Sequence, residues 1–246
     1  MPGLRCFLPS SRWQQDPTPL DREESHHVVD VLRKRPGDEL EVFDGSGRIA
    51  AARVTSVDRK TVHVSLSAPR RVPPPAVSIH LYQALPKTGK MEWIVQKSTE
   101  LGARRIVPLR CAHAVPRWSG EQAARKVERW RSIARNAARQ CGSAWIPEIA
   151  AVAELADVVG AADVPGVMLL ADLQPQARPL KEVLAGLRST PPASVGLVVG
   201  PEGDFSAAET DQMTSAGYIP VHLGPRVLRT ETAALYIVGA CAYEFD

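Results

Sequence analysis

Two hydrophobic periods divide the chain. Between residues 39 and 67, apolar and polar side chains alternate in three short runs, which is the two-residue period of strands with one buried face. These runs are Glu39–Phe43, Arg48–Val57 and Thr61–Ser67. The turn sequences Asp44-Gly45-Ser46-Gly47 and Asp58-Arg59-Lys60 separate them, and a short helical pattern over Ser25–Lys34 precedes them. The N-terminal part is therefore predicted to be a small β-rich module.

Downstream, continuous apolar runs alternate with longer helical stretches. Such runs are typical of strands buried on both faces of a parallel sheet. They are Val77–Leu81, Ile106–Leu109, Val167–Ala171, Val195–Val199 and Ile219–Leu223. The clearest helix is Ser119–Cys141, which places Val127, Trp130 and Ala134 on one face and begins with a Ser119/Gln122 capping pattern. This order predicts an α/β domain with a parallel sheet.

A proline-rich segment separates the two patterns. Residues 71–75 read Arg-Val-Pro-Pro-Pro, which favours an extended conformation. We predict a first domain over residues 1–70, a linker over 71–75 and a second domain over 76–246. The last helical segment, Thr232–Phe245, is apolar nearly all round, so we expect it to be buried on every side, within the chain or in a homodimer interface.

Composition narrows the kinds of partner. The 246 residues are 44% hydrophobic and carry a formal net charge of +3, which permits a nucleic-acid partner without requiring one. No apolar run approaches the roughly 20 residues that span a bilayer, so we expect a cytoplasmic protein with no membrane partner. The four cysteines form no Cys-x-x-Cys pair, and His26 and His27 have no third ligand at a recognisable spacing. We therefore expect no metal.

One glycine motif imitates a cofactor site. Gly45-Ser46-Gly47-Arg48-Ile49-Ala50 fits the dinucleotide-binding fingerprint, which requires a helix directly after it and an acidic residue about twenty positions later. Here a strand pattern follows and no carboxylate lies near position 70. We interpret the motif as a hairpin turn.

Two segments in the last quarter share one pattern. Val198–Ser206 reads Val-Val-Gly-Pro-Glu-Gly-Asp-Phe-Ser, and Leu223–Ala233 reads Leu-Gly-Pro-Arg-Val-Leu-Arg-Thr-Glu-Thr-Ala. In each, an apolar strand ends in a Gly-Pro turn that opens into a helix, and Ser206 with Glu209 forms a capping box for the first helix. The carboxyl ends of neighbouring strands are where open α/β sheets bind ligands. The pair of turns therefore predicts a ligand site.

These segments resemble the SPOUT superfamily of RNA methyltransferases, and in detail the ribosomal RNA small subunit methyltransferase E family, which methylates uracil N3 in 16S ribosomal RNA. The likeness extends to Gln83–Gly102, which resembles the start of the family's methyltransferase domain. Upstream, Arg5-Cys6-Phe7, His27–Arg33 and Phe43–Gly47 resemble its PUA-like RNA-binding module. The resemblance implies a PUA-like β-barrel domain followed by a SPOUT domain with a parallel sheet and a C-terminal trefoil knot.

The same resemblance implies that the two turns hold S-adenosyl-L-methionine (S-adenosylmethionine) in a bent shape. The residues that match the family's cofactor shell are Val199, Gly200, Pro201, Glu202, Gly203, Leu223, Gly224, Leu228, Arg229, Thr230 and Ala233. Gly200 and Gly203 would let the backbone approach a ligand without a Cβ in the way.

Three charged residues of the second turn are the catalytic candidates. Arg229 would stabilise the negative charge that spreads over uracil as its N3 proton leaves, and Arg226 would help to hold RNA. Glu231 would accept that proton or orient the arginine. A carboxylate near a helix N-terminus is also favoured as a cap, and this second interpretation of Glu231 stays open.

RNA contacts are expected from both domains. By resemblance they include Arg5 and His27, and the candidates after the first helical segment are Arg33, Lys34 and Arg35. Lys87 and Lys90 would meet phosphate at the start of the second domain. For all these cations a solvated surface role is the alternative.

Two departures from the family pattern bear on the site. Where the family usually reads Glu-Ala-x-Glu-Gln-x-x-Arg, this chain has Asn136, Arg139 and Ser143 in place of two acids and an arginine, and Asp204 replaces a common glycine. The alternatives to 16S ribosomal RNA methylation are another SPOUT methyltransferase, acting on a ribose 2′-hydroxyl or a transfer RNA base, and a non-catalytic RNA-binding ribosome-assembly factor.

Overall fold

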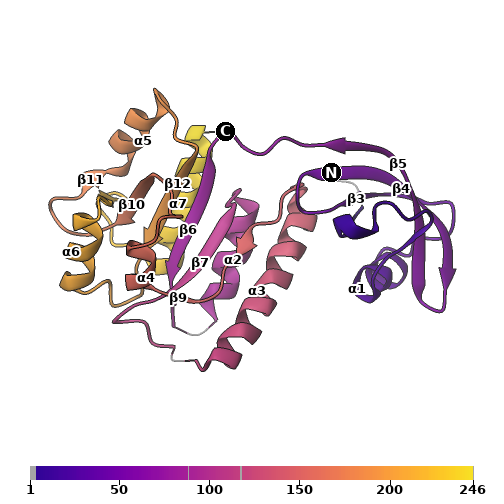
Figure 1. Ribbon diagram of the computed structural model, residues 1–246, viewed down its shortest axis with the longest axis horizontal. Helices are drawn as coiled ribbons and strands as arrows, with labels where there is room; N and C mark the ends of the chain where they lie inside the picture. Colours follow the sequence, from indigo (N-terminus) through magenta and orange to yellow (C-terminus); the bar gives the residue numbers. More distant parts are fainter. Residues whose placement is uncertain (1–3, 88, 117, 246) are drawn as a thin grey trace. The chain divides into compact units, whose positions relative to one another are not determined.

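The computed structural model describes residues 4–87, 89–116 and 118–245 (Figure 1). The chain forms two compact units, one of residues 1–74 with 135–146 and one of residues 75–134 with 147–246. The long helix that we expected in the second domain thus ends in the first unit. The domain limits 1–70, 71–75 and 76–246 stay a prediction.

The first unit contains a five-stranded sheet with the strand order β1-β3-β4-β5-β2. The strands are β1 (Arg5–Phe7), β2 (Thr18–Pro19), β3 (Glu39–Phe43), β4 (Arg48–Asp58) and β5 (Thr61–Arg71). Strand β1 pairs in parallel with β3, and the other pairs are antiparallel. Val42, Val54 and Val64 fill the core beneath the sheet. The predicted β-rich module is confirmed.

Helical turns close this core. They are η1 (Ser10–Arg12), α1 (Arg22–His26) and the π-helical turn η2 (His27–Val31). The helix begins earlier than the predicted Ser25 because Asp21 caps it, accepting a hydrogen bond from the Glu24 amide at 2.8 Å. It ends at Val31 rather than at the predicted Lys34.

The glycine motif at residues 45–47 lies in the β3–β4 hairpin, as predicted. The Asp44 carboxylate accepts hydrogen bonds from the amides of Ser46 at 2.8 Å and Arg48 at 3.0 Å. Partial burial raises the pKa of Asp44, but these hydrogen bonds and those from the Ser46 and Ser10 hydroxyls outweigh it and lower the pKa. The amides of Ser46, Gly47 and Arg48 are thus already hydrogen-bonded, Gly47 to the Ala144 carbonyl, which speaks against a nucleotide cradle.

The predicted parallel sheet is present in the second unit. It has eight strands, in the order β11-β13-β10-β12-β6-β7-β8 with β9 beside β7. Its central strands are β6 (Ser78–Ala84), β7 (Arg105–Arg110), β10 (Val167–Ala171), β12 (Ser194–Val199) and β13 (Ile219–His222). The short strands are β8 (Glu148–Ile149), β9 (Ala153–Glu154) and β11 (Arg178–Pro179).

Helices cover both faces of this sheet (Figure 1). They are α2 (Lys90–Glu100), α3 (Gly120–Cys141), α4 (Leu155–Val159), α5 (Leu180–Arg188), α6 (Ala207–Ser215) and α7 (Thr230–Phe245). Leu155 and Val158 of α4 and Met213 of α6 share one core with the strands. On the other face, α7 packs against β6 and β12 and is flanked by α2 and α5.

Helix α7 is not buried on every side within the chain, which corrects one of the two outcomes expected for it. Tyr236 is 52% exposed and Tyr243 is 89% exposed, whereas Ile237 and Cys241 are fully buried. Trp93 of the adjacent helix α2 is also 44% exposed. The apolar outer face of α7 therefore has no cover from the described part of its own chain.

Among the described residues, no helix is long and apolar enough to cross a membrane. Within the same residues, no group of three or more His, Cys, Asp or Glu side chains is placed to hold a metal ion. The four cysteines are free thiols.

Candidate active site

A cavity of about 340 Å³ opens at the carboxyl ends of β10, β12 and β13. Both Gly-Pro turns line it, the first loop (residues 200–206) after β12 and the second loop (residues 223–229) after β13. Its lining residues are Ala171, Asp172, Leu173, Val199, Gly200, Pro201, Glu202, Asp204, Leu223, Arg226, Val227, Leu228, Arg229, Thr230 and Ala233. The structure thus brings together the predicted cofactor shell except Gly203 and Gly224.

Those two glycines lie just outside the cavity. Gly203 packs behind the first loop, where a Cβ would lie 3.3 Å from the His113 Cβ. Gly224 has φ of 115°, which only glycine adopts without strain, and lines a neighbouring depression with Pro225 and His222. Both glycines therefore shape the loops rather than the cavity wall.

The first loop is held from behind by the segment after β7. The Nδ1 of His113 lies 3.0 Å from the carbonyl oxygens of both Gly203 and Asp204, a geometry in which it donates. The Ala112 amide donates to Glu209 at 2.7 Å. Glu209 also closes the predicted capping box with Ser206 at the start of α6. The loop is therefore fixed at its middle and at its C-terminal end.

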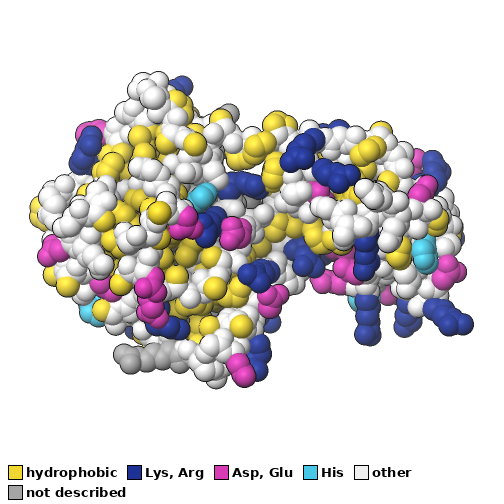
Figure 2. Space-filling model, viewed as in Figure 1, with side chains coloured by type: hydrophobic (Ala, Val, Ile, Leu, Met, Phe, Trp, Pro, Cys, Tyr) yellow, Lys and Arg dark blue, Asp and Glu magenta, His cyan; other side chains and the backbone are white. Residues whose placement is uncertain are grey.

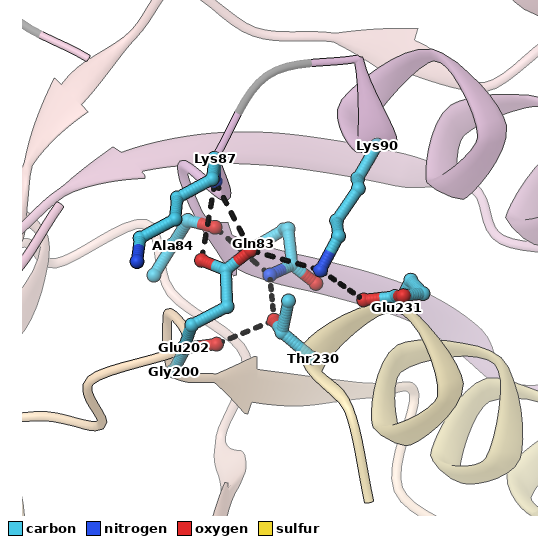
Figure 3. A network of polar contacts seen from close by, with 8 residues as sticks. All are labelled: Gln83, Ala84, Lys87, Lys90, Gly200, Glu202, Thr230 and Glu231. Atoms are coloured by element: carbon cyan, nitrogen blue, oxygen red, sulfur yellow. Dashed lines mark hydrogen bonds and ion pairs between the residues drawn. The ribbon is translucent and has the colours of Figure 1, made fainter. Parts of the chain in front are cut away.

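A lysine bridges the two turns (Figure 3). The Nζ of Lys90, at the start of α2, lies 3.0 Å from a carboxylate oxygen of Glu202 and 3.1 Å from one of Glu231. The Lys87 amide also donates to Glu202 at 3.1 Å. Hydrogen bonds to Glu202 and Glu231 raise the pKa of Lys90. Partial burial raises the pKa of Glu202, but the hydrogen bonds from Lys90 and Lys87 outweigh it and lower the pKa.

A second contact joins the turns beneath this bridge. Gln83, fully buried at the end of β6, donates from Nε2 to the Thr230 hydroxyl at 2.9 Å (Figure 3). Thr230 in turn donates to the Gly200 carbonyl at 2.6 Å. The start of α7 is thereby tied to the first loop, and the Gly200 carbonyl is fixed beside the cavity.

The second loop presents unpaired cations. Arg226 and Arg229 are exposed at the cavity mouth, and neither guanidinium has an ion-pair or hydrogen-bond partner among the described residues. Two exposed apolar side chains, Val227 at 77% and Leu173 at 58%, lie at the same mouth. Unpaired guanidinium groups beside exposed apolar surface suit an anionic, partly aromatic ligand.

Asp172, which follows β10 directly, lines the cavity although no predicted motif included it. Its side chain is 7% exposed, and its Oδ1 accepts a hydrogen bond from the Gln174 amide at 3.1 Å. Its Oδ2 is buried without a partner in the described part of the chain, although it lines the cavity wall. A buried, half-satisfied carboxylate calls for a cation or a hydroxyl donor. An acid directly after an apolar strand was the available signal.

Of the residues predicted to contact RNA, Arg33 and Arg35 are exposed, and Lys34 and His27 are half-buried in the first unit. Burial, followed by the charge of Arg139, lowers the pKa of His27. Lys87 is exposed, and Lys90 is paired with Glu202 and Glu231.

Arg5 is placed differently. It is 5% exposed, pairs with Glu41 at 2.7 Å and lies over the Phe43 ring. Its guanidinium also donates to the Ser143 carbonyl at 3.1 Å. This placement speaks against an RNA contact, because leaving these partners would strand a buried charge.

The departures near residue 139 have a structural counterpart inside the first unit. The Arg139 guanidinium donates to both carboxylate oxygens of Glu24 at 3.2 Å and to Asn136 at 2.9 Å. Glu24 is 1% exposed, and burial raises its pKa although Arg139 opposes this. Arg139 therefore neutralises a buried acid and does not face outward.

Comparisons with known proteins agree with this geometry. Residues 73–242 match a family model described as an RNA methyltransferase domain, and residues 20–67 match an RNA methyltransferase PUA domain. The ribosomal RNA small subunit methyltransferase E of Bacillus subtilis is 31% identical, over 98% of this chain and 97% of its own. The Mycobacterium tuberculosis protein of that name is 34% identical over 90% of this chain and 84% of its own.

A solved structure agrees as well. The Neisseria gonorrhoeae ribosomal RNA small subunit methyltransferase E, bound to S-adenosylmethionine, superposes with a TM-score of 0.82 at 26% identity, over 96% of this chain and 95% of that one. The resemblance carried by the two turns is confirmed over both units: this chain belongs to the RNA methyltransferase family, among the ribosomal RNA small subunit methyltransferase E proteins.

Proposed function

We propose that this protein methylates N3 of a specific uridine in 16S ribosomal RNA of the small subunit, with S-adenosylmethionine as methyl donor. The observation that carries the proposal is the cavity that both Gly-Pro turns line, in a chain of this family. The guanidinium groups of Arg226 and Arg229 lie at its mouth without a partner among the described residues.

The residues of the cavity fit this cofactor. The wall is apolar at Val199, Leu223 and Leu228, which suits the adenine ring. The buried, unpartnered oxygen of Asp172 suits a ribose hydroxyl or a positively charged group, and S-adenosylmethionine carries both. When bound, the cofactor supplies an electrophilic methyl group. Val199, Gly200, Thr230 and Ala233 would hold it from the sides of the two turns.

The catalytic roles fall to the second turn. Uracil N3 becomes nucleophilic as its proton leaves, and the negative charge then spreads to the flanking carbonyl oxygens. Arg229 would stabilise this charge, and Arg226 would hold the RNA strand. Glu231 lies in the first turn of α7 with 16% of its side chain exposed, and its ion pair with Lys90 orients it. Glu231 would accept the N3 proton. In its other interpretation, it would only cap the N-terminus of α7 and pair with Lys90.

We propose a homodimer for the active form. Trp93 of α2 and Tyr236 and Tyr243 of α7 are exposed on two helices that pack together. A large exposed apolar patch is typical of an interaction surface. A second copy of the chain would cover it and so provide the burial that the apolar sequence of α7 leads us to expect.

We further propose a trefoil knot, in which the second loop threads past the first. The chain leaves β13, an outer neighbour of β10, and returns in α7 to pack against β6 and β12. The first unit would supply RNA contacts through Arg33, Lys34, Arg35 and His27. A small-ribosomal-subunit substrate would place the protein in the cytoplasm.

The test is methyl transfer to three substrates in parallel. Labelled S-adenosylmethionine is incubated with unmodified small subunits, protein-free 16S RNA and transfer RNA, and the products are analysed by nucleoside mass spectrometry. We expect 3-methyluridine in the small subunit. A 2′-O-methyl product, or label only in transfer RNA, would overturn the substrate assignment but retain the cofactor. Cofactor binding without transfer to any RNA would favour the non-catalytic alternative.

A further inference from the structure

A hollow outside the catalytic cavity combines an aromatic ring with cations. It measures about 330 Å³ and is lined by Trp118, Gln122, Arg125, Lys126 and Arg129, at the N-terminal end of α3 in the second unit. Figure 2 shows Lys and Arg side chains on the surface over this helix. None of these residues lines the cavity at the strand ends, and the chemistry proposed above does not use them.

Trp118 is fixed in position although its ring is partly exposed. Its ring centroid lies 5.9 Å from that of Trp130, with the planes tilted by 55°, and Trp130 is 1% exposed. The following helix begins with the predicted capping box, in which the Ser119 amide donates to the Gln122 side chain at 3.1 Å and the Gln122 amide donates back at 3.4 Å. A partner of Trp118 would therefore meet a ring that is already ordered.

Two cations beside the ring are unneutralised. Arg129 is engaged by Glu92, with two contacts of 2.5 and 2.8 Å that raise the pKa of Arg129. Within the described residues, no carboxylate lies within ion-pair distance of Arg125 or Lys126. The Lys126 ammonium lies over the Trp118 ring, 5.9 Å from its centroid, near the outer limit of a cation–π contact. Its flexible stem lets it move to a phosphate when a flat group covers the ring.

We propose that this hollow is a stacking platform for an unpaired nucleotide of the RNA substrate. Trp118 would stack on one base, while Arg125 and Lys126 would contact the phosphates on either side. Single-stranded RNA is bound in this way, by an aromatic face for the base and cations for the backbone. An acidic protein segment would match the cations but would leave the ring without a use. The inference rests on the proposed function, because it takes RNA as the substrate.

Stacking and packing can be separated with two substitutions of Trp118. Trp118→Leu keeps an apolar group against Trp130 but removes the flat face, whereas Trp118→Phe keeps a smaller face. Arg125→Ala with Lys126→Ala leaves the ring in place and alters only exposed side chains. Lys181→Ala is the control, since it removes one exposed cation from α5, away from the hollow.

The experiment measures KM and kcat for methyl transfer to unmodified small subunits, together with direct binding of protein-free 16S RNA. We expect Trp118→Leu to raise KM and weaken RNA binding by about tenfold, with kcat at saturation and cofactor binding unchanged. Trp118→Phe should restore most of the loss. The double variant should lower the slope of log K against log salt by about 1.4, or about 0.7 for each phosphate contact.

Three results would overturn the platform. Trp118→Leu and the double variant could both retain wild-type KM and RNA affinity. Trp118→Phe could be as defective as Trp118→Leu with folding intact by circular dichroism, which would make the residue a packing element. Lost affinity for whole subunits with unchanged affinity for protein-free RNA would identify a ribosomal protein as the occupant. Failure of the proposed function is recognised separately, because the wild-type protein would then form no 3-methyluridine in the small subunit.

Discussion

The two loops that form the cavity differ in how they are held. The first loop is fixed by His113 behind it, by Lys90 at Glu202 and by the capping box at Ser206. In the second loop, residues 223–229, no side chain makes a hydrogen bond or ion pair within the described residues. Its hydrogen bonds involve the backbone: the Gly224 amide donates to His222 at 3.3 Å, and the Arg229 carbonyl accepts from the Ala233 amide of α7 at 2.8 Å.

This difference assigns different tasks to the two loops. A loop whose hydrogen bonds are already satisfied keeps its shape whether or not a ligand is present, which suits a wall of preorganised backbone groups. A loop with unpaired guanidinium groups gains its partners only from the ligand. Substitutions in the second loop should therefore affect transfer to RNA, whereas substitutions that loosen the first loop should affect stability and cofactor affinity.

The largest effect is expected from Arg229→Ala. Loss of the guanidinium removes the stabilisation of the developing uracil anion, so kcat should fall by about 10²- to 10³-fold. Cofactor affinity should change little, because Arg229 lies at the cavity mouth and its guanidinium has no partner among the described residues. Labelled methyl transfer and calorimetry with S-adenosylmethionine measure the two quantities. Retained turnover would remove Arg229 from the catalytic step.

Arg226→Ala is the matched control for Arg229→Ala, since it removes the same group from the same loop. We expect a higher KM for the ribosomal substrate and a nearly unchanged kcat. If the two variants lose the same kcat, the assignment of separate roles fails, and both arginines would have to act on the same charge.

The next effect concerns the cavity wall. Asp172→Asn keeps the size of the side chain and removes its charge, so the unpartnered oxygen would offer a weaker acceptor. We expect cofactor affinity to fall by about ten- to a hundredfold, because hydrogen bonds to charged groups contribute about 1.5–3 kcal/mol. Calorimetry measures this directly, and thermal unfolding without ligand should be unchanged or slightly improved. Unchanged affinity for S-adenosylmethionine would mean that Asp172 only stabilises the turn at Gln174.

Patterns that are local in sequence predicted the fold well. Strands β3 and β10 have the predicted bounds, Glu39–Phe43 and Val167–Ala171. The alternating pattern of β3 and the continuous apolar run of β10 each have clear ends in the sequence. Strand β5 extends to Arg71, beyond the predicted Ser67, because pairing with β4 continues through polar residues that carry no hydrophobic signal.

Long-range electrostatics was the part that the sequence could not reveal. Lys90 looked like a surface lysine for RNA, yet it is paired with Glu202, which lies 112 residues further along the chain. Arg5 looked like an RNA contact until its pairing with Glu41 was visible. Asp172 does not belong to a Gly-Pro turn, so that motif did not indicate it. Its place in the site depends on the cavity that the other loops complete. Charge partners are set by topology, which local patterns do not encode.

A smaller effect tests the fixed loop. Lys90→Met keeps the apolar stem of Lys90 and leaves the carboxylates of Glu202 and Glu231 without their shared cation. We expect unfolding of the second unit to shift down by about 2–4 °C at neutral pH, the size of a lost, partly exposed ion pair. Lys97→Met is the control from the same helix and should shift the transition less, because within the described residues Lys97 pairs with Glu100 alone.

The pH dependence gives this prediction a sign. The pKa of Glu202 is lowered below its ordinary value of 4.5, so its contribution is present above about pH 4.5 and is lost as the pH falls further. The pKa of Lys90 is raised above 10.5, so its contribution is present below about pH 10.5 and is lost as the pH rises past the folded value. The difference in unfolding temperature between wild type and Lys90→Met should therefore be largest between these two pH values. A difference of equal size at pH 3.5 would rule out the ion pair as its cause.

The smallest effect concerns Asp204, where the chain departs from the glycine that is common in the family. Its φ of 58° is a left-handed conformation, which favours glycine, but its carboxylate compensates by accepting a hydrogen bond from the Phe205 amide at 2.8 Å. Asp204→Gly exchanges that bond for relief of strain and should leave stability within about 0.5 kcal/mol of wild type. Asp204→Ala loses the bond and keeps the strain, so it should destabilise by about 1 kcal/mol or more. Chemical denaturation of the three proteins measures the difference. If Asp204→Gly is less stable than Asp204→Ala, the Asp204 carboxylate contributes more than its hydrogen bond to the Phe205 amide. The first loop would then depend on the charge of Asp204 as well as on its own backbone.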